Sequence, residues 1–142
     1  MRGRGLLVAL GLWTLVVWAT RIDNVLGQDD LTPAGRAARL ALALSFTILG
    51  VALLVVAWRA RGRELSGAER LLIAVTTLWT IGVWVVRGIG IAVGDHEAAF
   101  IAVHTVLAVV SIALAAVTLR GTTMPLRHGT TGNRRADGDV TT

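Results

Sequence analysis

Residues 71–93, LLIAVTTLWTIGVWVVRGIGIAV, are followed by GDHE at residues 94–97 and by AAFIAVHTVLAVVSIALAAVTL at residues 98–119. Each long apolar run matches the roughly 20 residues that a helix needs to cross about 30 Å of hydrocarbon. The four polar residues between the runs leave room only for a tight turn. This segment therefore predicts a transmembrane hairpin of two antiparallel helices.

Two further apolar runs precede this hairpin, at residues 6–26 and 37–58. The 142-residue chain is 54% hydrophobic and 16% charged, whereas a soluble domain usually has about 25% charged residues. The sequence thus predicts an all-α fold, a four-span transmembrane helix bundle. We expect a first hairpin in residues 1–65, a second in residues 66–121 and a disordered tail in residues 122–142, where there is little to bury.

Three short motifs predict where helices begin. Thr32 followed by Pro33 is typical of an N-cap with proline at the first helical position. Ser66 with Glu69 three residues later predicts a capping box. Asp95 is predicted as the N-cap of the last helix, with Glu97 in its first turn.

The arginines predict the orientation in the membrane. All 14 basic residues are arginine, and ten of them lie in the N-terminus, in residues 59–70 and in residues 120–135. The positive-inside rule places these segments, and so both termini, in the cytoplasm. We expect a multi-pass protein of the cytoplasmic membrane. Nucleic acid is not an expected partner, because the arginines lie mostly at the ends of spans.

The two halves of the chain align when one is shifted by 66 residues. The alignment pairs tryptophans, an intramembrane arginine, an aspartate and a serine: Trp13 with Trp79, Trp18 with Trp84, Arg21 with Arg87, Asp29 with Asp95, and Ser45 with Ser111. These pairs predict a tandem duplication, in which two parallel hairpins are related by an axis along the membrane normal. Residues 1–19 also have the features of a signal peptide. We expect no cleavage there, because the duplication needs the first helix.

The second half also resembles a known group of proteins. The residues involved are Trp79-Thr80, Val83-Trp84, Gly94-Asp95, Val103-His104 and Leu119-Arg120-Gly121. This pattern, over about residues 76–121, resembles a family of very small actinobacterial two-helix membrane proteins without an assigned activity. The first half lacks the histidine, since Ala38 stands opposite His104. The resemblance implies a membrane hairpin and no catalytic residues.

A polar cluster is predicted within the apolar spans. Residues spaced i, i+4 and i+7 share one helix face, and two such stripes exist: Thr14, Trp18 and Arg21, and Thr80, Trp84 and Arg87. Arg87 and His104 each lie six residues from the turn at residues 94–97, hence about 9 Å below it on facing helices. The candidate site is therefore Trp18, Arg21, Trp84, Arg87 and His104.

Two interpretations of this cluster remain open. It could be a site for an anionic headgroup, a small ligand or a proton. Alternatively, the arginines extend to lipid phosphates, the tryptophans form an interfacial belt and His104 makes a structural hydrogen bond. In the second case we expect His104 to accept from Arg87 and to donate to a carbonyl of the first or third helix.

The sequence favours no enzyme, metal or cofactor. The other histidines, His96 and His128, lie outside the spans, which disfavours a haem held within one chain. No cysteine is present, and no P-loop or HExxH motif occurs. We expect a non-enzymatic accessory or interaction protein whose partners are the lipid bilayer and another membrane protein or a second copy. The alternative is a small channel or carrier with a polar site around Arg21, Arg87 and His104.

Overall fold

The computed structural model describes residues 2–28 and 31–123. Within these ranges the chain forms four α-helices: α1 (Arg2–Leu26), α2 (Pro33–Arg59), α3 (Gly67–Val93) and α4 (Ala98–Thr123). Each is long and apolar enough to cross a membrane. The all-α, four-span architecture predicted from the sequence is therefore confirmed. The predicted tail lies outside the described residues except for Thr122 and Thr123, which extend α4.

Two of the three predicted helix starts are confirmed. The Thr32 side chain accepts a hydrogen bond from the Gly35 amide at 3.2 Å, and Pro33 is the first helical residue. Ser66 Oγ accepts from the Glu69 amide at 3.3 Å, while the Glu69 carboxylate accepts from the Ser66 amide at 2.8 Å. Both caps satisfy amides that would otherwise lack a partner in the first helical turn.

The predicted start of the last helix is wrong. α4 begins at Ala98, and its first hydrogen bond runs from the Ile101 amide to the Glu97 carbonyl at 3.1 Å. Glu97 therefore occupies the N-cap position, and Asp95 lies in the turn before it. The reason is geometric: α3 ends at Val93, and residues 94–97 are all needed to reverse the chain.

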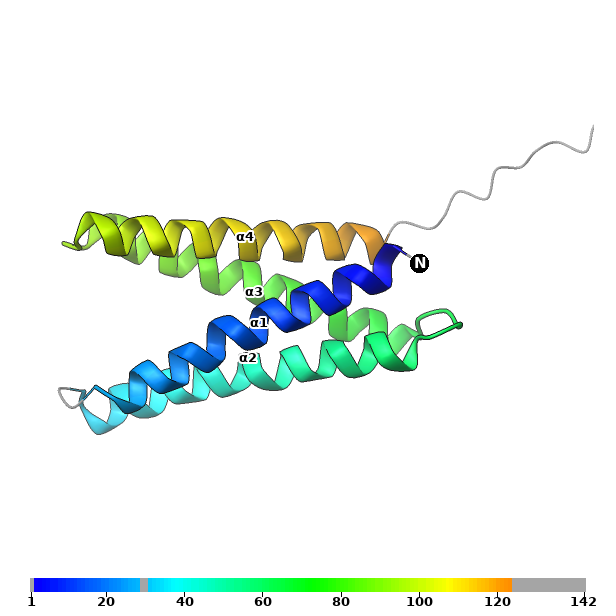
Figure 1. Ribbon diagram of the computed structural model, residues 1–142, viewed down its shortest axis with the longest axis horizontal. Helices are drawn as coiled ribbons and strands as arrows, with labels where there is room; N and C mark the ends of the chain where they lie inside the picture. Colours follow the sequence, from blue (N-terminus) through cyan, green and yellow to red (C-terminus); the bar gives the residue numbers. More distant parts are fainter. Residues whose placement is uncertain (1, 29–30, 124–142) are drawn as a thin grey trace, which may run out of the picture.

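The helices form two antiparallel hairpins, α1–α2 and α3–α4 (Figure 1). α1 also packs along α4, whereas α2 and α3 make little contact. In Figure 1 the hairpins converge toward the chain termini and diverge toward the connections at residues 27–32 and 94–97. We call these the terminal end and the two-loop end of the bundle.

Glycines bring α1 and α2 close together. A Cβ atom added at Gly11 would lie 3.1 Å from the Gly50 carbonyl oxygen and 2.9 Å from Leu54 Cδ2. Small residues favour such contacts in membranes, where helices associate through packing because lipid tails are as apolar as leucine. In α3, a Cβ atom at Gly82 or Gly88 would meet nothing within 4 Å. The close approach is therefore a property of the first hairpin.

An apolar core fills the terminal half of the bundle. Its buried residues come from all four helices: Leu7, Leu10, Leu53, Val56, Ala57, Ile73 and Ala115. A second, smaller cluster of Trp18, Ala43 and Phe46 lies nearer the two-loop end. The packing therefore fills the interior of the terminal half. A separate cavity of about 570 Å³ lies at the terminal end, beside Arg4 and residues 60–65.

One side-chain hydrogen bond joins the hairpins within the described residues. Trp13 Nε1 of α1 donates to Ser111 Oγ of α4 at 2.9 Å. Ser111, Ala115 and Thr118 are all buried, so α4 presents a stripe of small side chains on its inner face. Small residues in this position let two helices approach closely.

The connection between the hairpins is held by an ion pair. Arg63 Nη1 donates to Glu69 Oε2 at 2.8 Å, and a second contact joins Arg63 Nη2 and Glu69 Oε1. The hydrogen bond to this carboxylate raises the pKa of Arg63 above its ordinary value. Because the guanidinium is exposed, the pair contributes little to stability. Its role is to fix the path of the chain into the capping box.

Candidate functional site

All five predicted site residues line a single cavity. This histidine cavity has a volume of about 250 Å³ and lies among α1, α3 and α4. Trp18 and Arg21 come from α1, Trp84 and Arg87 from α3, and His104 from α4. The sequence stripes face inward because their threonines, Thr14 and Thr80, are buried. The structure thus brings together residues that are 86 positions apart in the sequence, Trp18 and His104.

A second cavity opens from the same arginines toward α2. This arginine cleft has a volume of about 440 Å³ and separates the hairpins at the two-loop end. Its polar lining comes from both hairpins: Arg21, Gln28 and Arg39 from the first, and Arg87 and His96 from the second. Trp18, Arg21 and Arg87 line both cavities, which are therefore neighbours.

The three arginines of the cleft lie at one level of the bundle. Arg21 is five residues before the end of α1, Arg39 is six after the start of α2, and Arg87 is six before the end of α3. At 1.5 Å per residue, each lies about 8–9 Å below the two-loop end. Their charges repel one another. A compact group of like charges is thus placed at the depth of the membrane interface.

Carboxylates do not compensate these charges within the described residues. The one salt bridge there is Arg63–Glu69, at the terminal end. Arg21 and Arg87 are half-buried and make no hydrogen bond within residues 2–28 and 31–123. A charge inside hydrocarbon costs at least about 2.5–3.5 kcal/mol unless it reaches the interface or a partner. The arginine cleft therefore presents guanidinium donors that an anion can satisfy.

Gln28 positions the outer wall of the cleft. Arg39 Nη1 donates to Gln28 Oε1 at 2.9 Å, and Arg36 Nη2 donates to the Gln28 carbonyl oxygen. These bonds join the beginning of the first connection, just after α1, to the first two turns of α2. Within residues 2–28 and 31–123 the Arg39 guanidinium bonds only through Nη1, so its other N–H groups can serve as donors to a ligand.

The predicted hydrogen bond of His104 is wrong in its partner. Its Nδ1 lies 2.9 Å from the carbonyl oxygen of Phe100, on its own helix, and not from a carbonyl of α1 or α3. The His104 ring also contacts the Phe100 ring, with centroids 3.9 Å apart, and His96 contacts Phe100 from the other side at 4.7 Å. The i–4 spacing explains the change, because a helix always offers that carbonyl at close range.

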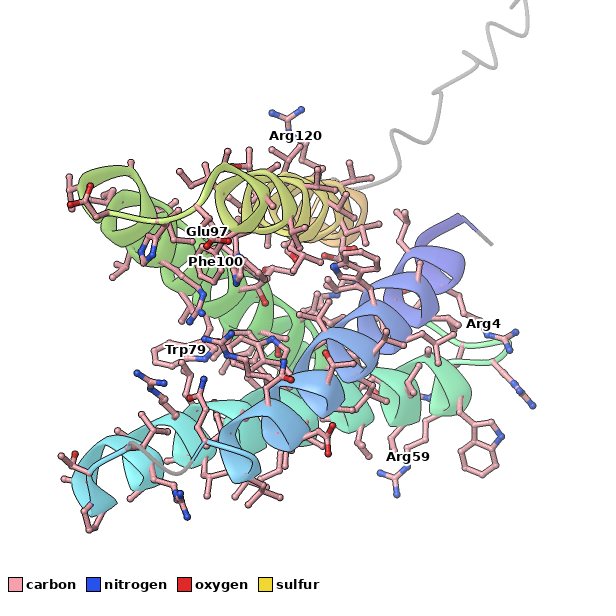
Figure 2. All side chains as sticks on the ribbon, turned by 60° about the vertical axis from the view of Figure 1, so that its left-hand side comes forward. Arg4, Arg59, Trp79, Glu97, Phe100 and Arg120 are labelled. Carbon is pink, nitrogen blue, oxygen red and sulfur yellow. The ribbon has the colours of Figure 1, made fainter. Side chains whose placement is uncertain are left out.

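The two paired tryptophans are core residues. Trp18 and Trp84 are only 4% and 5% exposed, so neither belongs to a lipid-facing belt. Trp18 stacks on Phe46 of α2, with ring centroids 4.1 Å apart and planes within 4° of parallel. Phe46 in turn contacts Trp79 of α3 at 6.4 Å. Figure 2 shows Trp79 pointing from α3 toward the first hairpin.

Sequence reasoning missed three important residues: Gln28, Arg39 and Phe46. Arg39 is not among the predicted site residues, although its distance from Pro33 equals that of Arg87 from Val93. Counting depth from the helix start would have found it. Gln28 and Phe46 carry no recognisable pattern, since their roles depend on how the two hairpins pack.

The histidine cavity and the arginine cleft are lined by guanidinium, imidazole and indole groups. Within the described residues no group of three or more His, Asp or Glu side chains could hold a metal ion. Comparisons of the chain with protein-family models, with curated proteins and with solved structures found no match. The fold and cavities define the class, a small four-helix integral membrane protein with a cationic cleft between its two hairpins.

Proposed function

We propose that this protein is a non-enzymatic membrane protein that binds an anionic group in the arginine cleft. The observation that carries this proposal is the convergence of Arg21, Arg39 and Arg87 from three helices on one cavity. Guanidinium groups bind phosphate and carboxylate oxygens through paired hydrogen bonds. A bound anion would offset the mutual repulsion of the three arginines. Because these arginines come from both hairpins, the anion would also fix the position of one hairpin relative to the other.

Thermal unfolding of the full chain in a neutral detergent tests this proposal. Glycerol 3-phosphate should raise the melting temperature, and Arg87→Gln should weaken its apparent affinity by about tenfold through loss of a charged hydrogen bond. Arg120→Gln is the matched control, because Arg120 is exposed and points away from the bundle in Figure 2. Equal responses from the two variants would contradict the anion site.

A carrier is the alternative function, since Arg21, Arg87 and His104 share one cavity at the boundary between the hairpins. A carrier must also open to the other side, where Leu7, Leu10, Leu53 and Ile73 are packed together. Proteoliposomes loaded with phosphate would decide between binding and transport. Binding without release of the trapped phosphate supports the accessory role; steady release that Arg87→Gln abolishes supports a carrier.

We also propose that the protein lies in the cytoplasmic membrane with both termini in the cytoplasm and the cleft on the outer side. The arginine-rich connection at residues 59–70 supports this orientation through the positive-inside rule. The chain has no cysteine, so single cysteines can report accessibility without further changes. In intact cells, a membrane-impermeant maleimide should label Glu97→Cys and not Arg61→Cys. The reverse labelling would invert the topology.

We further propose kinship with the small actinobacterial two-helix membrane proteins, on the residues of the second hairpin. The support for this proposal is the sequence pattern alone, above all Trp79-Thr80, Val83-Trp84 and Val103-His104. If one hairpin is the ancestral unit, residues 66–121 expressed alone should insert and self-associate. A monomer under crosslinking in lipid would argue against that origin.

A further inference from the structure

An apolar groove continues from the arginine cleft toward the middle of the bundle. It has a volume of about 820 Å³ and is lined by Leu42 of α2 and by residues of α3: Val75, Leu78, Trp79, Gly82, Val83, Val86 and Arg87. Leu42 and Arg87 line both the groove and the arginine cleft. The two spaces are therefore neighbours, and the charged group of Arg87 marks the boundary between them.

The groove has the length of one leaflet. From Arg87 to Val75 there are twelve residues of α3, or about 18 Å along the helix axis. Half of a hydrocarbon core is about 15 Å thick. The groove thus begins at the level of the arginines and runs past residue 80, the middle of α3, into the terminal half of the bundle. Its length suits one extended acyl chain whose headgroup lies at the level of the arginines.

The groove is open to lipid from the side. α2 and α3 make little contact, and Val75, Leu78 and Val86 are exposed on the surface of α3. A molecule can therefore enter from the bilayer without any movement of the hairpins. Lipid tails are as apolar as leucine, so tail burial in the groove brings no hydrophobic gain. Selectivity among lipids must therefore come from the charge of the arginines at the headgroup end. The groove only provides a space whose shape fits an acyl chain.

We propose that the cleft and the groove together bind one anionic membrane lipid, with its phosphate headgroup at Arg21, Arg39 and Arg87 and one acyl chain along α3. This inference rests on the proposed anion site and adds the chemical class of the ligand. Positive charge at the head end meets the phosphate, and an apolar channel of matching length receives the chain. A zwitterionic lipid offers the same chain with no net charge, so it binds more weakly.

Native mass spectrometry of the full chain, released from nanodiscs, tests the head end. Dioleoyl phosphatidylglycerol and dioleoyl phosphatidylcholine carry the same chains and differ in net charge. We expect one retained phosphatidylglycerol per chain, with about tenfold preference over phosphatidylcholine, and loss of that preference in Arg87→Gln and Arg39→Gln. Equal retention of the two lipids by the unmodified chain would overturn the lipid assignment.

Filling the groove tests the tail end. Gly82 lines the groove, and a Cβ atom added there meets nothing within 4 Å, so Gly82→Leu should fold and occupy the space of the acyl chain. We expect it to reduce phosphatidylglycerol retention about threefold to tenfold. Gly88→Leu is the matched control, since Gly88 is equally open and lies outside the groove. Equal retention by both variants would overturn the tail site.

A soluble probe separates this inference from the proposed function. Glycerol 3-phosphate has the headgroup chemistry and no chain, so Gly82→Leu should leave its binding unchanged while Arg87→Gln weakens it. If the probe binds normally but phosphatidylglycerol is not preferred, the anion site survives and the lipid assignment fails. If neither binds, both fail.

Tryptophan fluorescence gives a readout on the folded, lipid-embedded chain. Phosphatidylglycerol brominated on its chains, present as a small fraction of a phosphatidylcholine bilayer, should quench Trp79, which lines the groove and is 46% exposed. The quenching should fall in Trp79→Phe and persist in Trp58→Phe, because Trp58 is also exposed but lies at the terminal end of α2. Quenching no stronger than that by brominated phosphatidylcholine would overturn the site.

Discussion

The α1–α4 and α2–α3 interfaces join positions that are related by the same 66-residue shift, yet one is closed and the other is open. Between α1 and α4, Trp13 donates to Ser111 and small buried residues let the helices approach. Between α2 and α3, the corresponding serine, Ser45, donates to the Leu42 carbonyl of its own helix at 2.7 Å. The corresponding tryptophan, Trp79, lines the apolar groove.

One position offers a steric reason for this difference. Ala115 is fully buried in the stripe of α4, and the residue 66 positions earlier on α2 is Leu49. Leucine is bulkier than alanine, and a small residue at this position favours close approach of two helices. The comparison teaches that similar hairpins do not have to pack symmetrically, and that the open interface is where a ligand finds room.

The largest effect is expected at Phe46, which bridges the hairpins on the open side. Phe46 is fully buried between Trp18 and Trp79, so Phe46→Ala should lower the free energy of unfolding by about 3–5 kcal/mol. On the closed side the corresponding residue is Ile112, which is half-buried, and Ile112→Ala should cost only about 1 kcal/mol. Denaturant titration in mixed micelles measures both; similar losses would mean that the two interfaces are equally packed.

Exchanging Ala115 and Leu49 tests the steric explanation. Ala115→Leu should overpack the closed interface and destabilise the protein by about 1–3 kcal/mol, because this residue is fully buried. Leu49→Ala should change stability little, since Leu49 is half-buried. The same titration compares them. A silent Ala115→Leu would show that the seam of α4 does not determine the separation of the helices.

A smaller effect is expected from the hydroxyl groups of the paired serines. Ser111→Ala removes the acceptor of the Trp13 indole and should cost about 0.5–1.5 kcal/mol. Ser45→Ala removes only a bond within one helix and should be neutral within about 0.5 kcal/mol. Combining Ser111→Ala with Trp13→Phe should add little further loss. Additive losses would show that the two groups act independently.

The smallest effect concerns Thr118, a buried residue of the closed interface. Its hydroxyl has no hydrogen-bond partner within the described residues. Thr118→Val keeps the shape and removes an unsatisfied polar group, so it should raise the free energy of unfolding by up to about 1 kcal/mol. Thr14→Val serves as a second buried threonine for comparison. A loss of stability in Thr118→Val would reveal a partner for this hydroxyl.

Local sequence signals were sufficient to predict the helices. Apolar length determined the spans, and the Thr32 and Ser66 caps were readable because each acts within three residues. The Asp95 cap failed because the length of a turn depends on how far apart the two helix ends lie. That distance is a property of the packing and has no local pattern.

The parts of the candidate site that depend on residue spacing within one helix could be predicted. The parts that depend on how the two hairpins pack against each other could not. The stripes containing Arg21 and Arg87, and the depth of His104, were enough to place these side chains around one cavity. The arginine cleft depends on the divergence of the hairpins, so the sequence could give the depth of Arg39 but not its place in the cleft. The absence of pairing between α2 and α3 was likewise invisible, because the predicted repeat suggests two equal interfaces.

The Trp13–Ser111 hydrogen bond also constrains the order of events during synthesis. Its two residues are 98 positions apart, so it cannot form until the first half of α4 has left the ribosome. The first hairpin can form earlier from neighbouring segments, held by the contact of Gly11 with Gly50. α3 then enters the membrane next to the first hairpin, whose helix α2 it contacts only weakly. Until the last helix arrives, lipid fills the space beside α3. The α3 helix therefore contacts lipid before it packs in the complete bundle.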